Sequence, residues 1–261
     1  MIELLEDPAH RLVTIVGTGG IGKTRLAVTA ARELVHAFKD GATFVSLAAL
    51  SSIEFLAPTI LMALDVSLDG QVDARTQLHA YLRQREMLLI IDNWEHLLPQ
   101  DGGIELLAEM LQHAPGLTVL ATSRERLGLQ AEWLFNLQGL DYPQGLLLAE
   151  PETCSATQLF MQRARQVQHQ LVFSQADLSA ITRICQLVEG LPLAIELAAA
   201  SVGRRSCAEI ADEITAGVWV DDLAQQCFYL LLQHGGSFRL GLAGCWFAAE
   251  HFAEKGHGCS V

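Results

Sequence analysis

The fold of this chain is decided by the stretch Val13-Thr14-Ile15-Val16-Gly17-Thr18-Gly19-Gly20-Ile21-Gly22-Lys23-Thr24. It begins with a run of apolar and β-branched residues, which is typical of a buried strand. Four glycines follow, and after Lys23 and Thr24 the apolar residues recur at helical spacing. The spacing G-x-x-x-x-G-K-[ST] of a phosphate-binding loop between a strand and a helix is matched by Gly17, Gly22, Lys23 and Thr24.

Each residue type in this loop has a chemical reason. The glycines let backbone N–H groups turn toward an anion, and the N-terminus of the next helix adds unpaired donors. Lys23 can reach the terminal phosphates of a nucleotide, and the Thr24 hydroxyl can ligate Mg²⁺. A chance glycine-rich turn is the alternative, and the flanking strand and helix disfavour it. The expected nucleotide-binding residues are Gly17, Thr18, Gly19, Gly20, Ile21, Gly22, Lys23, Thr24 and Arg25.

Composition limits the kinds of partner that the chain can have. Its 261 residues are 51% hydrophobic, enough to bury the core of one large domain or of one domain plus a small second one. The formal charge of -13 argues against direct nucleic-acid binding by this module, which would need clustered Lys and Arg. The sequence contains no run of about 18 apolar residues, so no membrane span is expected. The acidic N-terminus has no signal-peptide pattern. We therefore expect a cytoplasmic protein whose six cysteines are free thiols.

The first part of the chain alternates between strand and helix patterns. We expect strands at residues 12–16, 42–47, 87–92, 117–122 and 133–137, and helices at residues 23–37, 53–64, 73–85 and 103–113. This alternation favours an α/β fold with a five-stranded, parallel, doubly wound sheet. The nucleotide-binding domain is expected to occupy residues 1–150.

After residue 151 the pattern contains helices alone. They are expected at residues 157–167, 174–188, 193–202 and 208–214. The second of them opens with Ser174 and Asp177, which resemble a capping box. We expect a small helical domain over residues 151–215, followed by an irregular or poorly packed tail over residues 216–261.

A second chemical landmark is the apolar run Met87-Leu88-Leu89-Ile90-Ile91-Asp92, which is typical of a strand buried on both faces. In a protein with a phosphate loop, an acid at the end of such a strand is placed to hold Mg²⁺, so we expect Asp92 and Thr24 to share the ion. The alternative for Asp92 is an ordinary turn acid. Glu95 either activates a water or is an acid at the start of a helix. Arg124 either senses the γ-phosphate or pairs with Glu125 at the surface.

Four motifs occur in a fixed order: Leu12 to Ala27, Leu89 to Leu97, Ala121-Thr122-Ser123-Arg124-Glu125 and Gly190-Leu191-Pro192-Leu193-Ala194. Together they resemble the signal transduction ATPases with numerous domains (STAND). In particular, they are similar to the NB-ARC-type module of bacterial LuxR-type and SARP-type transcriptional regulators. The resemblance covers about residues 5–215. The long separation between Lys23 and Asp92 leaves room for an extra strand, as in the additional-strand branch of P-loop ATPases.

The resemblance implies a switch that binds ATP or ADP with Mg²⁺. Gly22, Lys23 and Thr24 would hold the phosphates and the ion. Asp92 would be the Walker B acid, Arg124 the sensor, and Pro192 would lie over the adenine. In this family ADP holds a closed form, while ATP favours an open form that meets protein partners or assembles with itself, and hydrolysis is often slow.

Three departures from the family pattern leave alternatives open. The chain starts too late to contain a Val-Gly-Arg-Glu-like segment, and the residues after 215 do not resemble a winged-helix domain. Asp92 is followed by Asn93 instead of a second acid, which leaves the hydrolytic base open. We expect a truncated module, and an altered reading frame near residue 216 would explain the tail. The alternatives are an independent turnover ATPase and a non-binding remnant that acts as an interaction domain.

Overall fold

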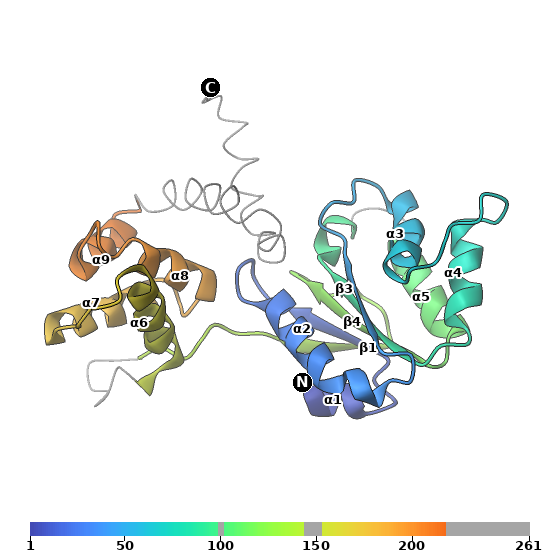
Figure 1. The fold of residues 1–261 in the computed structure, drawn as a ribbon, viewed down its shortest axis with the longest axis horizontal. Helices are drawn as coiled ribbons and strands as arrows, with labels where there is room; N and C mark the ends of the chain where they lie inside the picture. Colours follow the sequence, from blue (N-terminus) through green and yellow to red (C-terminus); the bar gives the residue numbers. More distant parts are fainter. Residues whose placement is uncertain (99–101, 144–152, 218–261) are drawn as a thin grey trace, which may run out of the picture. The chain divides into compact units, whose positions relative to one another are not determined.

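The computed structural model describes residues 1–98, 102–143 and 153–217. The described residues divide into two compact units. The first contains Met1–Thr18 and Lys23–Leu137, and the second contains Gly19–Gly22 and the residues from Gln138 onward. Figure 1 shows the sheet in the first unit and a group of helices in the second.

The first unit is built on a five-stranded parallel sheet with the strand order β2-β3-β4-β1-β5. Its strands are β1 (Leu12–Val16), β2 (Ala42–Ser46), β3 (Met87–Asp92), β4 (Leu117–Ser123) and β5 (Glu132–Asn136). Strand β4 lies between β1, which leads into the phosphate loop, and β3, which ends at Asp92. The predicted α/β fold, with an additional strand between the two motif strands, is confirmed.

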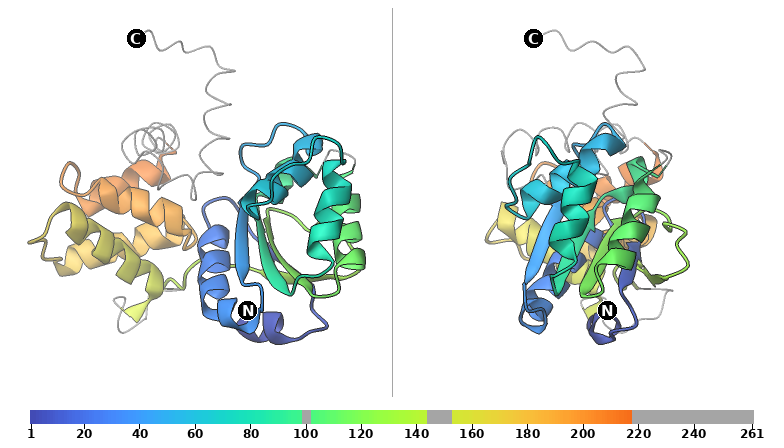
Figure 2. Two further views of the ribbon diagram at one scale, coloured as in Figure 1. Left: turned by 45° about the vertical axis from the view of Figure 1, so that its right-hand side comes forward. Right: turned by 90° about the vertical axis from the view of Figure 1, so that its right-hand side faces the viewer.

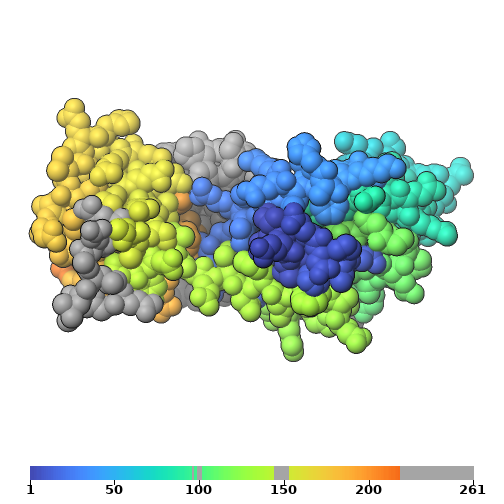
Figure 3. All heavy atoms as spheres, turned by 90° about the horizontal axis from the view of Figure 1, so that it is seen from below, coloured from blue at the N-terminus to red at the C-terminus, as the bar shows by residue number. Residues whose placement is uncertain are grey.

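Helices cover both faces of this sheet (Figures 1 and 2). They are α1 (Ile2–Glu6), α2 (Lys23–Leu34), α3 (Leu56–Ala63), α4 (Ala74–Leu82) and α5 (Gly103–His113), with single 3₁₀ turns at Val35–Ala37, Ile53–Phe55 and Trp94–His96. The α-helical part of the expected helix 23–37 ends at Leu34, and a 3₁₀ turn completes it. In the space-filling view of Figure 3, the N-terminal helix (dark blue) lies at the surface of the first unit.

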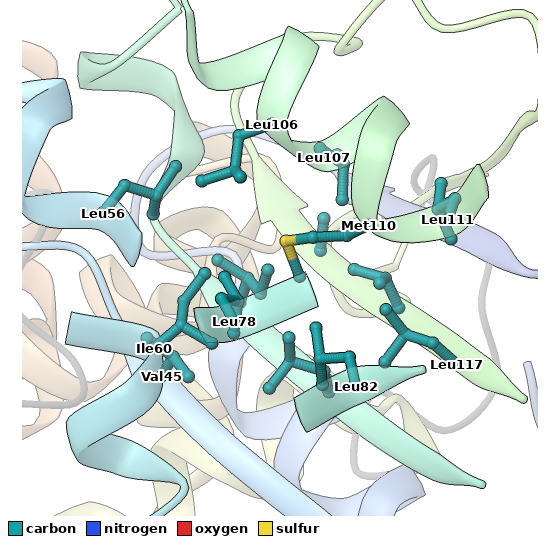
Figure 4. Close-up of a cluster of buried hydrophobic side chains, with 14 of the residues drawn as sticks. Val45, Leu56, Ile60, Leu78, Leu82, Leu106, Leu107, Met110, Leu111 and Leu117 are labelled. Atoms are coloured by element: carbon teal, nitrogen blue, oxygen red, sulfur yellow. The ribbon is translucent and has the colours of Figure 1, made fainter. Parts of the chain in front are cut away.

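Alternation along the strands divides their side chains between two cores. Leu89, Ile91 and Ala121 pack against α3, α4 and α5, in the core shown in Figure 4. Leu88, Ile90 and Leu120 pack on the opposite face, against α1 and α2. Because successive side chains point to opposite faces of a sheet, the same alternation places Asp92 and Thr122 on the α2 face.

The second unit contains four described helices, α6 (Ser155–Val167), α7 (Gln175–Leu187), α8 (Pro192–Ala200) and α9 (Cys207–Thr215). Their buried residues, among them Phe160, Ile181 and Ile195, form one core. Pro192 stands at the first helical position of α8, where its missing N–H costs no hydrogen bond.

Part of the expected tail, residues 218–261, lies outside the described residues. Cys154, Cys185 and Cys207 are free, and the other three cysteines lie in that same segment. Within the described ranges, no helix is both long enough and apolar enough to span a membrane.

Candidate functional site

The phosphate loop joins β1 to α2 in a backbone conformation that requires glycine. Gly20 has a φ of +76° and Gly22 a φ of +100°, a region that residues with a Cβ rarely adopt. The N–H of Gly17 donates to the carbonyl oxygen of Ser123 at 3.3 Å, which ties the start of the loop to the end of β4. The loop therefore begins on the sheet and turns into the first turn of α2.

Lys23 lies in that first turn and is 8% exposed. Its ammonium donates to the carbonyl oxygens of Gly17 at 2.8 Å and Thr18 at 3.1 Å. Burial is the main cause that lowers the pKa of Lys23, and Arg124 lowers it further, while Glu95 and Asp92 raise it. The ammonium is thus held against the phosphate loop, close to two carboxylates and one guanidinium.

Asp92 ends β3 and accepts two hydroxyl hydrogen bonds on one oxygen. Thr24 Oγ1 and Thr122 Oγ1 each donate to Asp92 Oδ1 at 2.6 Å. Burial, the dominant cause, raises the pKa of Asp92, and the two hydroxyls oppose that rise. A carboxylate beside a threonine hydroxyl is an oxygen donor set that suits Mg²⁺, so these residues fit the expected ion. The structure brings Thr24 and Asp92 together, as expected from the two motifs.

Glu95 and Arg124 follow β3 and β4 and form an ion pair. Arg124 Nε lies 3.2 Å from Glu95 Oε1, and the Glu95 side chain is 13% exposed. The sequence predicts the γ-phosphate or Glu125 as the partner of Arg124, and it does not predict Glu95. No local signal predicts it, because it depends on which strand is the neighbour of β4.

Thr122 is a second site residue that the sequence pattern does not predict. It belongs to the motif Ala121-Thr122-Ser123-Arg124-Glu125, in which the predicted role falls on Arg124 alone. The signal that finds it is the register, in which Ile91 pairs with Ala121, so that Asp92 and Thr122 follow side by side.

The remaining expected site residues are more scattered. Thr18 and Arg25 are exposed, whereas Ile21 is buried. In the second unit, the N–H of Leu193 donates to the carbonyl oxygen of Gly20 at 3.3 Å, so the residue after Pro192 contacts the tip of the loop.

Comparisons with known proteins agree with this geometry. The family model described as "AAA domain" matches residues 8–129. A predicted HTH-type transcriptional regulator of Mycobacterium tuberculosis is 37% identical over 224 residues, which are 85% of this chain and 22% of that protein. Regulatory protein AfsR of Streptomyces griseus is 31% identical over 130 residues, 47% of this chain and 13% of that protein. The chain thus spans less than a quarter of the length of either relative.

A solved structure shares the fold. It is a STAND protein with a tetratricopeptide repeat sensor from Pyrococcus horikoshii, with a TM-score of 0.51 and 18% identity over 86% of this chain and 33% of that one.

Proposed function

This chain is a P-loop ATPase module of the STAND regulator type, and from this premise we propose that it binds ATP or ADP with Mg²⁺ as a molecular switch. The observation that carries the proposal is the 2.6 Å hydrogen bond between Thr24 and Asp92 beside the buried ammonium of Lys23. Thr24 lies in the first turn of α2 and Asp92 at the end of β3, so both motifs are needed to build the pair. We propose that the module serves a cytoplasmic signalling or transcription regulator.

The proposed division of labour follows from the chemistry of each group. Thr24 and Asp92 would hold Mg²⁺, which when bound neutralises charge between the β- and γ-phosphates. Lys23 would exchange its bonds to the loop carbonyls for phosphate oxygens, and the N–H groups of the loop would add donors. Pro192 would lie over the adenine. We propose residues 1–150 as the nucleotide-binding domain and residues 151–215 as the helical domain.

The ion pair between Glu95 and Arg124 supports slow hydrolysis. Glu95 would orient the attacking water, and Arg124 would meet the γ-phosphate. Because Glu95 and Arg124 pair with each other, the ion pair has to open before Glu95 can orient a water or Arg124 can contact the γ-phosphate. A switch whose hydrolysis is slow keeps its ATP state long enough to meet protein partners or to assemble with itself.

Calorimetry tests the binding, and phosphate release tests the switch. We expect saturable binding of Mg-ADP and Mg-ATP, with steady-state phosphate release slower than the typical enzyme turnover of about 10 per second. An absence of nucleotide binding would favour a remnant that acts as an interaction domain. Fast turnover that Glu95→Gln abolishes would favour an independent ATPase.

A further inference from the structure

Thr122 lies at a junction of three strand ends. It is the penultimate residue of β4, and its side chain is completely buried on the α2 face of the sheet. The neighbouring strand β3 ends at Asp92, and the neighbour on the other side, β1, leads into the phosphate loop. Most buried hydroxyls are hydrogen-bonded, and the strand ends around Thr122 offer polar groups as partners.

The hydroxyl of Thr122 contacts both Asp92 and the residue after it. It donates to Asp92 Oδ1 at 2.6 Å and accepts from the backbone N–H of Asn93 at 3.1 Å. A hydroxyl has one proton to donate, and here that proton is committed to Asp92. The Thr122 side chain is therefore fixed by two bonds, and it fixes the Asp92 side chain in return.

The bond to Asn93 restrains an unfavourable backbone conformation. Asn93 has φ +71° and ψ +51°, in the left-handed region. This residue redirects the chain from β3 into the turn that buries Trp94, which is 1% exposed, and presents Glu95 to Arg124. The hydrogen bond to the N–H of Asn93 therefore restrains the backbone two residues before Glu95.

We propose that Thr122 is a positioning residue for both acids, acting on Asp92 through its proton and on Glu95 through the turn at Asn93. This inference rests on the proposed Mg-nucleotide function of the same site. Thr122 itself is not expected to touch the nucleotide, because its one proton is donated to Asp92 and its side chain is completely buried.

The test compares Thr122→Val with Thr14→Val in the full chain. Thr14 is also completely buried in the sheet, on β1, and its hydroxyl has no hydrogen-bond partner among the described residues. Both substitutions replace a buried threonine by its near-isosteric valine, and only the first removes contacts to Asp92 and Asn93. Thr122→Ser keeps the hydroxyl and should restore wild-type behaviour.

Two measurements are made on each variant. The first is the affinity for a fluorescent ATP analogue in Mg²⁺ and in EDTA. The ratio of the affinity in Mg²⁺ to the affinity in EDTA should fall about tenfold in Thr122→Val, as it does when other groups that orient a metal ligand are removed. The second is hydrogen exchange of the backbone amides from Asn93 to Leu97 without nucleotide. It should become about fivefold faster, as expected for the loss of one hydrogen bond.

The outcomes separate this inference from the function on which it rests. Equal values for Thr122→Val and Thr14→Val in either measurement overturn the positioning role, and so does a Thr122→Ser variant that fails to recover. If the wild type itself shows no Mg-dependent binding, the proposed function fails instead, and the Asp92 part of the inference fails with it. Should Thr122→Val not fold, Thr122→Ala takes its place in both measurements.

Discussion

Single residues balance the charges of the candidate site. The carboxylates of Glu95 and Asp92 and the guanidinium of Arg124 all lie close enough to Lys23 to shift its pKa, the acids upward and Arg124 downward. Two cations thus face two anions in a partly buried space. Loss of any one of them leaves an uncompensated charge where water screens it poorly.

We predict that Lys23→Ala weakens the binding of Mg-ATP by about 2–4 kcal/mol, which is about 30- to 1000-fold in Kd. The reason is the loss of a positive charge opposite the phosphates in a site where Lys23 is 8% exposed. Calorimetry measures the change. Lys39→Ala is the matched control, because Lys39 is exposed and lies outside the loop, and it should bind as the wild type does. Unchanged affinity in Lys23→Ala would mean that the loop does not bind phosphate.

We predict that Asp92→Asn weakens nucleotide binding far more in Mg²⁺ than in EDTA. The amide can still accept the two threonine hydroxyls but carries no charge for the ion. Parallel titrations in the two buffers measure the difference. An equal loss in both would point to a general folding defect and would count against Asp92 as an ion ligand.

At the scale of elements, the helices α7 and α9 begin in the same way. Ser174 and Asp177 form a reciprocal capping box at the start of α7, and Ser206 and Glu209 form another at the start of α9. Hydrogen bonds from Ser174 are the main cause that lowers the pKa of Asp177. A lowered pKa means that the folded state holds the charged carboxylate. The stabilisation is therefore present above the unfolded pKa near 3.8 and is lost as the pH falls through the folded value.

We predict that Ser174→Ala lowers the free energy of unfolding by about 1 kcal/mol at pH 7, and that the loss shrinks as the pH falls below 4. Urea unfolding at a series of pH values measures both effects. The control is Ser179→Ala in the same helix. Its hydroxyl donates to the Gln175 carbonyl oxygen within the helix and caps no terminus, so it should have little effect at any pH. A loss that stays constant with pH would contradict the role of Asp177.

At the scale of the whole molecule, the described contacts of α9 end with its C-terminal turn. The N–H of Ala216 donates to the Asp212 carbonyl oxygen, and that of Gly217 donates to the Ile214 carbonyl oxygen. Every residue that we assign to the candidate site precedes this turn. The chain up to Gly217 therefore contains all the contacts on which the proposed function depends.

We predict that a chain ending at Gly217 binds nucleotide within about threefold of the full chain, about 0.6 kcal/mol. It should also be more soluble, since residues 218–261 carry apolar side chains without a clear period. A fluorescent-ATP titration and light scattering on both chains measure the two effects. Unfolding or loss of binding in the shorter chain would show that the last 44 residues of the chain pack on the module as a third element.

The sequence alone determined the fold class, the phosphate loop and the acid at the end of β3. Each of these depends on a local pattern. Short windows of residues contain the glycine spacing and the apolar run of Met87–Asp92. The same holds for the hydrophobic period that distinguishes each strand from each helix. They also predict that Thr24 lies near Asp92, because the phosphate loop and Asp92 are both found at the carboxyl ends of parallel strands, and these ends meet at one edge of a sheet.

The tertiary structure decided which distant side chains meet. The contact between Thr122 and Asp92 follows from the register of β3 and β4. The ion pair of Glu95 and Arg124 forms because β3 and β4 are neighbouring strands in the sheet. Arg11 likewise donates to the carbonyl oxygens of Leu111 and Ala114 at the end of α5. Such contacts join residues far apart in the chain. Strand order and register arise from packing of the whole core, so no local window of sequence contains them.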